Sequence, residues 1–247
     1  MLRGKTEASL KAFLLAAGHG TRLRPITDSI PKCLVPIRGI PMLKIWLELC
    51  SRNGIDEVLI NLHAHVELVS KVLREVESPV KVRVVEENLL LGSAGTLYAN
   101  RDWVTDEAAF WIFYADVLTT TNFRRMAEFH HSRQTLATLG LCQVADPSRC
   151  GVAICDVSGV IREFEEKPRR PRSNWVFAGI MIANPAILSS VPCRLPADIG
   201  FDVLPTLVGS MVGYPISDYL IDIGTLENYQ AAQNSWPGLN SAAGVSS

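Results

Sequence analysis

Apolar runs of strand length alternate with longer amphipathic segments in the first half of the chain. The runs are rich in Val, Ile, Leu and Phe, and the segments between them carry apolar residues at the 3.6-residue spacing of a helix. The predicted strands are residues 12–16, 57–61, 80–85 and 110–114, and the predicted helices are residues 43–53, 66–76 and 94–102. Strands that alternate with helices predict an α/β fold, in which βα units build a mostly parallel sheet flanked by helices.

The pattern changes after Leu136, where strand-like runs follow one another with only short helical candidates between them. These runs are residues 136–144, 152–156, 161–165 and 176–182. They predict a small antiparallel portion that packs on a Rossmann-like first half and closes over a crevice at its strand ends. A final helix is expected over residues 225–235, which completes a single domain of residues 1–236. Most residues from Trp236 onward are small or polar, and we expect disorder over residues 237–247.

The composition is that of a self-sufficient globular domain. The 247 residues carry 24 Lys and Arg against 25 Asp and Glu, for a formal net charge of −1. Nucleic-acid binding calls for a clear excess of basic residues, so we expect no nucleic-acid partner. A chain of this length buries about three quarters of its unfolded surface and needs no metal or disulfide in order to fold. The six cysteines contain no C-x-x-C pair, and we interpret them as small buried hydrophobes in a reducing compartment.

The N-terminal segment carries a weak imitation of a targeting signal. Basic residues precede the apolar run 12–17 and imitate a signal peptide, but Gly18 interrupts the run before the ~7–15 apolar residues of such a signal are complete. No apolar stretch approaches the ~20 residues that a membrane span needs. We therefore expect a cytoplasmic protein with no membrane partner. The sequence leaves the oligomeric state open, and a homo-oligomer is possible.

The strongest chemical signal follows the first predicted strand. Residues 15–25 read Leu-Ala-Ala-Gly-His-Gly-Thr-Arg-Leu-Arg-Pro. A dinucleotide fingerprint would need a glycine where Leu23 stands, and a Walker A loop would need a Gly-Lys-Ser/Thr that is missing. What remains is a glycine loop whose backbone N–H groups can approach phosphates, with Arg22 and Arg24 beside it. Prolines at positions 25, 31, 36 and 41 stiffen the segment that follows, so that Lys32 is presented from an extended strip.

These motifs resemble the signature of the sugar-nucleotide pyrophosphorylases, the nucleotidyltransferases that join a sugar 1-phosphate to a nucleoside triphosphate. The resemblance rests on residues 15–25, Pro31-Lys32, Gly39-x-Pro41, Gly92-Ser93-Ala94-Gly95, Ala115-Asp116, Glu166-Lys167-Pro168 and Asp222-Ile223-Gly224-Thr225. It covers nearly the whole chain and implies a fold of the nucleotide-diphospho-sugar transferase type, with the antiparallel portion binding the sugar. Longer relatives add a β-helix or acyltransferase domain; because the chain ends shortly after Thr225, we expect neither.

The resemblance implies a phosphoryl-type transfer without a general base. An oxygen of the sugar phosphate attacks the α-phosphorus of the triphosphate and pyrophosphate leaves. Because the nucleophile is already an anion, the site must mainly supply positive charge. Arg22 and Lys32 are then the catalytic cations, Arg22 on the triphosphate and Lys32 on the α-phosphoryl group and the leaving pyrophosphate. Asp116 and Asp222 are the implied ligands of a Mg²⁺ cofactor, which binds few protein oxygens together with substrate phosphates.

The remaining family positions form two binding sets. The implied nucleotide set is Leu15, Ala17, Gly18, Gly20, Thr21, Arg22, Glu87, Gly92 and Ala94. The implied sugar-phosphate set is Gly151, Glu166, Lys167, Asn174 and Gly179. In the second set Lys167 holds the phosphate, Glu166 and Asn174 contact sugar hydroxyls, and the backbone around the two glycines shapes the pocket.

The implied base is guanine. If the side chain of Glu87 reaches the base edge, as the matching position does in the family, its carboxylate suits the adjacent N1–H and N2–H donors of guanine and repels the carbonyls of uracil or thymine. Residues 88–91 lack a proline common in the family, which leaves Glu86 as the alternative reader. We therefore expect a guanylyltransferase that takes GTP and a manno-configured hexose or heptose 1-phosphate. The alternatives are a uridylyl-, thymidylyl- or cytidylyltransferase of the same fold and a non-catalytic regulatory subunit.

Overall fold

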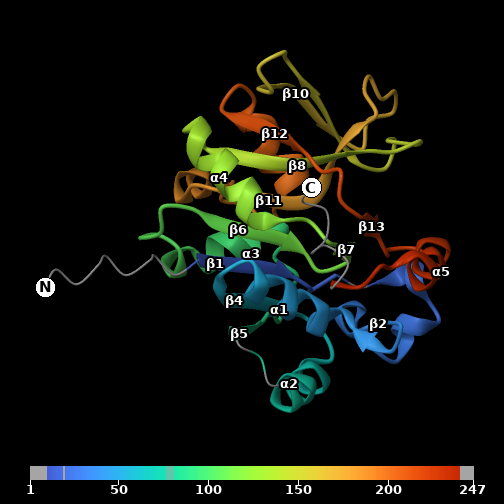
Figure 1. The fold of residues 1–247 in the computed structure, drawn as a ribbon. Coiled ribbons are helices and arrows are strands. Elements are labelled where there is room, and N and C mark those ends of the chain that lie inside the picture. Colours follow the sequence, from blue (N-terminus) through green and yellow to red (C-terminus); the bar gives the residue numbers. More distant parts are fainter. Residues whose placement is uncertain (1–9, 19, 77, 79, 240–247) are drawn as a thin grey trace, which may run out of the picture.

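The computed structural model describes residues 10–18, 20–76, 78 and 80–239 (Figure 1). In this part of the chain a nine-stranded sheet has its main path in the order β10-β9-β11-β6-β1-β4-β5, with β8 joined to β11 and β12 joined to β8. Its strands are β1 (Leu10–Leu15), β4 (Ile55–Leu62), β5 (Lys81–Glu86), β6 (Phe110–Tyr114), β8 (Ala137–Gln143), β9 (Gly151–Cys155), β10 (Ile161–Glu166), β11 (Trp175–Ala183) and β12 (Met211–Pro215). Two short ribbons join β2 (Pro36–Ile37) to β3 (Ile40–Pro41) and β7 (Val117–Thr119) to β13 (Leu220–Asp222).

The sheet has a parallel half and a mostly antiparallel half, in which β12 pairs in parallel with β8. Strand β1 pairs in parallel with β4 and β6, and β4 pairs in parallel with β5. Strand β11 pairs antiparallel with β6, β8 and β9, and β10 pairs antiparallel with β9. The predicted Rossmann-like half and the small antiparallel portion are therefore both confirmed, and β11 joins them into one hydrogen-bonded sheet.

Helices cover both faces of the sheet (Figure 1). They are α1 (Met42–Arg52), α2 (Val66–Glu75), α3 (Ser93–Ala99), α4 (Phe123–Arg133) and α5 (Leu226–Ser235). Short 3₁₀ or π turns are η1 (Thr21–Leu23), η2 (Ile26–Asp28), η3 (Lys32–Leu34), η4 (Arg101–Trp103), η5 (Pro185–Ser190), η6 (Ile199–Val203) and η7 (Leu204–Leu207).

The alternation of side chains along β1 divides the core in two. Leu14 faces the cluster that holds Trp46 of α1 and Phe123 of α4, whereas Phe13 faces the cluster that holds Leu97 of α3 and Leu204 of η7. Both clusters consist of buried apolar side chains, with partly buried ones packed around them. The sheet is thus covered on each side, as a parallel sheet requires.

Several elements differ from the sequence prediction. The pattern does not predict α4, because only Phe123, Met126 and His130 of its 11 residues are buried. The helix expected over residues 94–102 ends at Ala99 as α3, and the chain continues as the 3₁₀ turn η4. Trp236, from which we expected a polar tail, is 4% exposed and its ring lies 5.3 Å from that of Tyr219, because burying a large aromatic surface outweighs the polar context.

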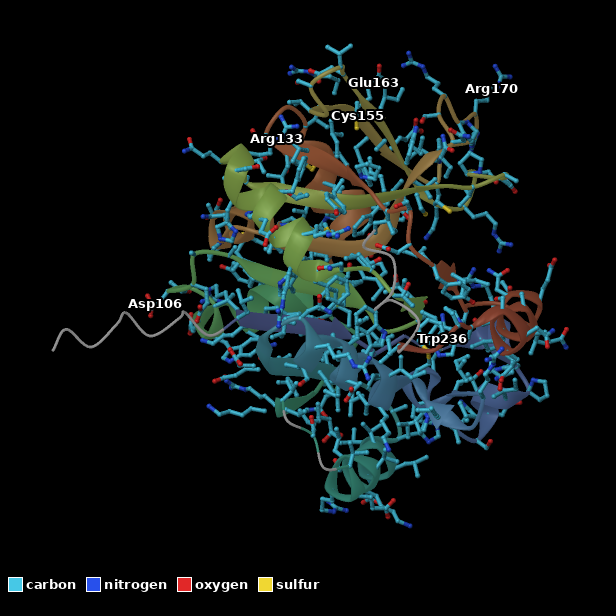
Figure 2. The ribbon with its side chains drawn as sticks, in the orientation of Figure 1. Asp106, Arg133, Cys155, Glu163, Arg170 and Trp236 are labelled. Carbon is cyan, nitrogen blue, oxygen red and sulfur yellow. The ribbon has the colours of Figure 1, made fainter. Side chains whose placement is uncertain are left out.

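The cysteines differ in exposure. All six cysteines are free thiols; Cys33 and Cys50 are buried as predicted, whereas Cys155 and Cys193 are exposed. In Figure 2, Cys155, Glu163 and Arg170 lie at the end of the molecule that the antiparallel portion forms, far from α2. Residues 240–247 of the predicted tail lie outside the described residues. Across the described ranges, no helix has the length and apolar character that crossing a membrane demands.

Candidate active site

A cavity of about 290 Å³ opens at the carboxyl ends of the parallel strands. This is the edge at which α/β sheets bind their ligands. The lining residues are Leu15, Ala16, Gly18, Gly20, Thr21, Arg22, Lys32, Cys33, Ser93, Tyr114, Ala115, Asp116, Asp198 and Gly224. The structure therefore brings Asp116 together with the predicted glycine loop and both predicted catalytic cations, which come from a distant part of the chain.

Charged side chains converge on Gly224. The ammonium of Lys32 forms an ion pair with a carboxylate oxygen of Asp116, and both side chains are largely shielded from solvent. A Cβ atom at Gly224 would lie 2.7 Å from Oδ1 of Asp222, 3.0 Å from Nη2 of Arg22 and 3.1 Å from Nζ of Lys32. Two cations and two carboxylates thus lie close together, and the space between them exists because residue 224 has no side chain.

Asp222 enters this volume from the last strand. Strand β13 pairs antiparallel with β7, which places Asp222 opposite Val117 and so next to Asp116. Its Oδ1 accepts a hydrogen bond from the N–H of Gly224 at 2.6 Å. Loss of hydration in the cleft raises the pKa of Asp222, and the nearby Asp116 carboxylate raises it further.

This pair of carboxylates fits the expected divalent cation. Hard oxygen donors that repel one another gain from a shared cation, and Mg²⁺ binds through one or two carboxylates when substrate phosphates supply other ligands. Among the residues that the structure describes, no group of three or more His, Cys, Asp or Glu side chains could hold a metal ion. A cation held by Asp116 and Asp222 would therefore depend on oxygens from substrate and water.

The loop after β1 is folded tightly behind the cavity. Gly20 has a φ of 64° at the start of η1, its carbonyl accepts hydrogen bonds from Leu23 N–H at 2.9 Å and Thr27 Oγ1 at 2.7 Å, and Leu23 anchors the turn in the core. Leu15, Gly18, Gly20 and Thr21 of the predicted nucleotide set line the cavity, whereas Ala17 does not.

Glu87 of the predicted nucleotide set lies outside the cavity and is only 4% exposed. Its Oε1 accepts hydrogen bonds from Nδ2 of Asn61 at 2.9 Å and from Oγ1 of Thr96, and its Oε2 accepts one from the N–H of Leu91 at 3.2 Å. A buried carboxylate with these donors is satisfied within the protein.

The same network fixes the neighbouring loops. Oδ1 of Asn61 accepts a hydrogen bond from the N–H of Ala16 at 2.8 Å, so Glu87 is linked through Asn61 to the start of the glycine loop. Glu86, the alternative base reader, is exposed at the end of β5. Base recognition by either carboxylate therefore stays a prediction.

Gly92 and Ala94 stand at the start of α3, where the sequence suggested a nucleotide contact. The N–H groups of Ala94 and Gly95 both donate to the carbonyl of Ala197, at 2.9 and 3.1 Å. Gly92 has a φ of 78°, and a Cβ there would lie 2.3 Å from the same carbonyl oxygen. Protein, rather than phosphate, thus satisfies the first N–H groups of this helix.

Three of the predicted sugar-phosphate residues, Gly151, Glu166 and Lys167, lie together at the end of β10. Glu166 and Lys167 are adjacent, with Nζ of Lys167 3.7 Å from Oε1 of Glu166. Gly151 lies opposite Glu166 in the β9–β10 pairing, and a Cβ at Gly151 would lie 2.6 Å from Oε2 of Glu166. Gly179, with a φ of 71°, interrupts β11 against Tyr114, and Asn174 is exposed just before β11. None of these five residues lines the first cavity.

Burial also acts on Glu166. Its side chain is 14% exposed, and loss of hydration raises its pKa although the Lys167 ammonium opposes this shift. Such a carboxylate gains from hydroxyl donors that a ligand would bring.

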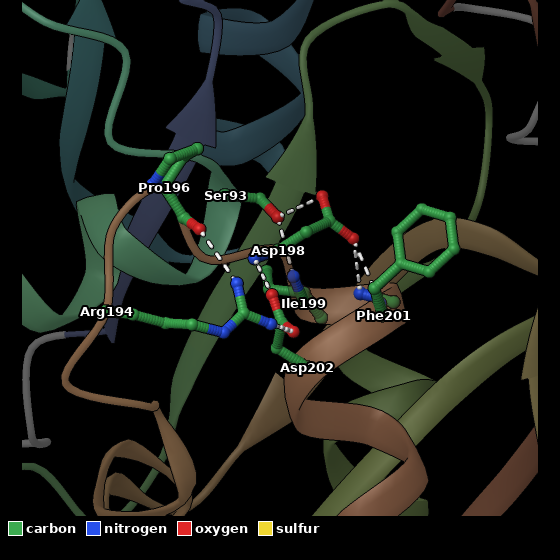
Figure 3. A network of polar contacts seen from close by, with 8 residues as sticks. Ser93, Arg194, Pro196, Asp198, Ile199, Phe201 and Asp202 are labelled. Carbon is green, nitrogen blue, oxygen red and sulfur yellow. Dashed lines mark hydrogen bonds and ion pairs between the residues drawn. The ribbon is translucent and has the colours of Figure 1, made fainter.

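Sequence reasoning missed Ser93, Tyr114 and Asp198. All three line the same cavity as Arg22 and Lys32. Oγ of Ser93 donates to Oδ2 of Asp198 at 2.9 Å and accepts from the N–H of Ile199 at 2.7 Å (Figure 3). Tyr114 ends a predicted strand and Ser93 follows a predicted glycine, so both could have been found by position. Asp198 lies in a turn-rich segment without hydrophobic periodicity, and nothing in its surroundings marked it.

Comparison with known proteins shows which family this chain resembles. A family model described as "Nucleotidyl transferase" matches residues 11–237. The chain is 31% identical over 227 residues to mannose-1-phosphate guanylyltransferase 1 of Arabidopsis thaliana, and 30% identical over 226 residues to the mannose-1-phosphate guanylyltransferase catalytic subunit beta of Xenopus tropicalis. The matches cover 89% of this chain but only 63% and 62% of those relatives.

Solved structures share the fold. A UDP-glucose pyrophosphorylase complexed with UDP-glucose has a TM-score of 0.79 at 22% identity, covering 92% of this chain and 98% of that one. HddC from Yersinia pseudotuberculosis has a TM-score of 0.78 at 23% identity, covering 92% and 99%. At these identities the likeness concerns the fold.

Proposed function

Because this chain belongs to the nucleotidyl transferase family, we propose that it transfers a nucleotidyl group from GTP to a manno-configured hexose or heptose 1-phosphate, giving a GDP-sugar and pyrophosphate. The convergence of Arg22, Lys32, Asp116 and Asp222 around Gly224 carries the proposal, because it concentrates the charges that this transfer needs. The names of the relatives at 30–31% identity support guanine as the base and mannose 1-phosphate as the acceptor. Such substrates agree with the expected cytoplasmic location.

The side chains divide the work by the charge that each one carries. Arg22 holds the triphosphate at the glycine loop, and the ammonium of Lys32, aimed into the cleft by Asp116, stabilises charge on the α-phosphoryl group and the departing pyrophosphate. Lys167 binds the phosphate of the acceptor and Glu166 accepts hydrogen bonds from its hydroxyls. An oxygen of that phosphate forms the new bond to the α-phosphorus while the bond to pyrophosphate breaks, so no proton has to be abstracted.

A divalent cation, Mg²⁺ in our proposal, would be held by Asp116 and Asp222 and would neutralise charge on the reacting phosphates. Such a cation would also relieve the repulsion between the two carboxylates, which adds to loss of hydration in raising the pKa of Asp222. Binding the cation and binding the triphosphate should therefore favour each other.

The surroundings of Glu87 bear directly on the choice of base. The carboxylate of Glu87 already accepts hydrogen bonds from Asn61, Thr96 and Leu91, so direct reading of guanine would require it to give up or share these donors. Uridylyl, thymidylyl or cytidylyl transfer by the same site is the competing assignment.

The test is pyrophosphate release with Mg²⁺ for GTP, UTP, dTTP, CTP and ATP, each against mannose, glucose and manno-heptose 1-phosphates. We expect release with GTP and a manno-configured acceptor, and loss of about 100-fold or more of this activity in Lys32→Ala. The exposed Lys44 of α1 offers a matched control, and Lys44→Ala should keep full activity.

Each other outcome refutes a defined part of the proposal. Release with a pyrimidine triphosphate in place of GTP would keep the transfer and refute guanine. Release with a glucose acceptor alone would refute the manno configuration. No release with any pair, from a protein that still binds nucleotide, would favour the regulatory alternative.

A further inference from the structure

Phe201 exposes a large aromatic ring beside the predicted sugar-phosphate residues. It belongs to η6 and is 54% exposed, although a phenylalanine normally gains from burial of its whole side chain. The centroid of its ring lies 5.2 Å from Nζ of Lys167, which is the distance of a cation–π contact. An apolar group is therefore displayed where a ligand, rather than the core, can contact it.

Hydrogen bonds at its base fix the position of this ring. Oδ1 of Asp198 accepts the N–H groups of Gly200 at 2.8 Å and Phe201 at 3.1 Å, and Oδ2 of Asp198 accepts from Ser93 (Figure 3). The N–H of Asp198 donates to Oδ2 of Asp202 at 2.8 Å, and Asp202 is in turn paired with Arg194. The exposed ring thus stands on a turn whose backbone these hydrogen bonds hold in place.

The turn also touches Glu166. A Cβ at Gly200 would lie 2.4 Å from Oε2 of Glu166, so the backbone next to Phe201 is in direct contact with that carboxylate. Nζ of Lys167 lies 3.7 Å from Oε1 of Glu166 on the other side. A ring, an ammonium and a largely buried carboxylate therefore stand side by side.

This combination matches the three chemical features of a sugar 1-phosphate. The phosphate suits the ammonium, the hydroxyls suit the carboxylate, and the C–H face of a pyranose suits an aromatic surface. We propose that Phe201 is a specificity-determining residue of the sugar 1-phosphate subsite, where its ring packs on the apolar face of the sugar and keeps the Lys167 ammonium directed at the phosphate. This inference rests on the proposed function, which places the acceptor at Glu166 and Lys167.

The test compares Phe201→Ala, Phe201→Leu and Phe201→Tyr in the full chain, with Val157→Ala as the control for loss of an exposed apolar side chain far from Glu166. The KM values of the sugar 1-phosphate and the nucleotide are measured with whichever pair gives turnover. Phe201→Ala should raise the KM of the sugar 1-phosphate about five-fold or more, because the stacked contact and the cation–π contact are both lost. The KM of the nucleotide should change less than about two-fold, and Phe201→Tyr should retain the wild-type values within about two-fold.

A sugar 1-phosphate KM that Phe201→Ala leaves unchanged would overturn the proposal. An equal rise in both KM values would also overturn it, because it would indicate a general distortion of the site. Phe201→Leu should lie between the other two variants, since it keeps apolar area without a ring.

Calorimetry without nucleotide separates this inference from the proposed function. Its probes are mannose 1-phosphate and inorganic phosphate. If no pair gives turnover, the proposed function fails, yet the wild type should still bind mannose 1-phosphate more tightly than inorganic phosphate, and Phe201→Ala should remove most of that difference. Equal binding of the two probes by the wild type would refute the subsite itself.

Discussion

Gly224 shows how much of the site depends on a side chain that is missing. The Arg22, Lys32 and Asp222 side chains end within about one atomic contact of where its Cβ would stand. Gly224→Ala should therefore displace the ends of these flexible side chains while leaving the backbone in place. We expect kcat to fall by about ten-fold or more, because small misplacements of phosphate-binding groups are costly in transfer reactions.

Pyrophosphate release and thermal unfolding, measured together, check this prediction. The melting temperature should stay close to that of the wild type, because the crowded atoms are side-chain termini. Unchanged kcat would mean that the three side chains do not act at the position where the structure gathers them.

At this scale the sequence pointed to Arg22, Lys32, Asp116 and Gly20, and the structure places all four in the lining of one cavity. Asp116 and Gly20 follow strand ends, whose place in an α/β fold is predictable, whereas Lys32 was named from the family resemblance. The roles of these residues stay predictions. Glu87 was different. Its position in the chain was compatible with a base contact, but the amide of Asn61 and the hydroxyl of Thr96 come from other elements and enclose it. Burial of this kind depends on tertiary packing, which a local motif does not encode.

Among the elements, the junction between α3 and η6 links the two halves of the site. The carbonyl of Ala197 caps α3, Ser93 on α3 holds Asp198, and Asp198 caps η6. Gly92 allows this approach, because any Cβ at that position would lie 2.3 Å from the Ala197 oxygen. The elements that flank the cavity are therefore locked to one another through backbone atoms.

Gly92→Ala should break this junction. Backbone atoms cannot yield as side-chain ends do, and the φ of 78° adds strain, so we expect a loss of about 3 kcal/mol or more in the free energy of unfolding. Gly209→Ala is the matched control, because its φ is 86° but nothing lies within 4 Å of the added Cβ. Backbone strain alone should then lower the free energy of unfolding by about 1–2 kcal/mol. Urea denaturation measures both, and equal losses would show that the contact with Ala197 adds nothing.

The sequence did not predict helices and strands that lack a clear pattern of apolar residues. Helix α4 buries too few apolar side chains to show a stripe, and β13 is a three-residue strand whose partner β7 is equally short. Helix α4 and strand β13 therefore form because of their contacts with the rest of the protein and not because of a local sequence pattern. The long strands β1, β4, β6 and β11 were found because they are apolar on both faces.

For the molecule as a whole, His130 gives the folded state a dependence on pH. It is buried in α4 with Nδ1 2.9 Å from Oγ1 of Thr138, and burial, with a smaller effect of His131, lowers its pKa to about 4. The unfolded chain titrates its histidines at about 6.5 and so binds this proton first. The stabilising effect of a neutral His130 is complete above pH 6.5 and is lost as the pH falls from about 6.5 to about 4.

His130→Gln should remove this part of the acid sensitivity, because glutamine can still bond to Thr138 and does not titrate. The measurement is the midpoint of urea unfolding at a series of pH values from 7.5 to 4.5, a range that covers most of the titration of His130. The control is His131→Gln, which changes the neighbouring, exposed histidine. The His130→Gln curve should be flatter than that of the wild type, and the His131→Gln curve should parallel it. Parallel curves for all three proteins would show that His130 does not titrate as described.

The position of strand β13 late in the chain affects the order in which the site can form during synthesis. The carboxylate pair of the site joins Asp116, near the middle of the chain, to Asp222, which arrives only after the antiparallel portion has been crossed. Chains emerge from the ribosome N-terminus first, at a rate of roughly 5–20 residues per second. While the strand that carries Asp222 is still being made, the glycine loop, Arg22 and Lys32 have long been available to fold. A nascent chain therefore gains its phosphate-binding cations early and its second carboxylate last, so it cannot acquire the complete charge balance of the site before its final strand pairs with β7.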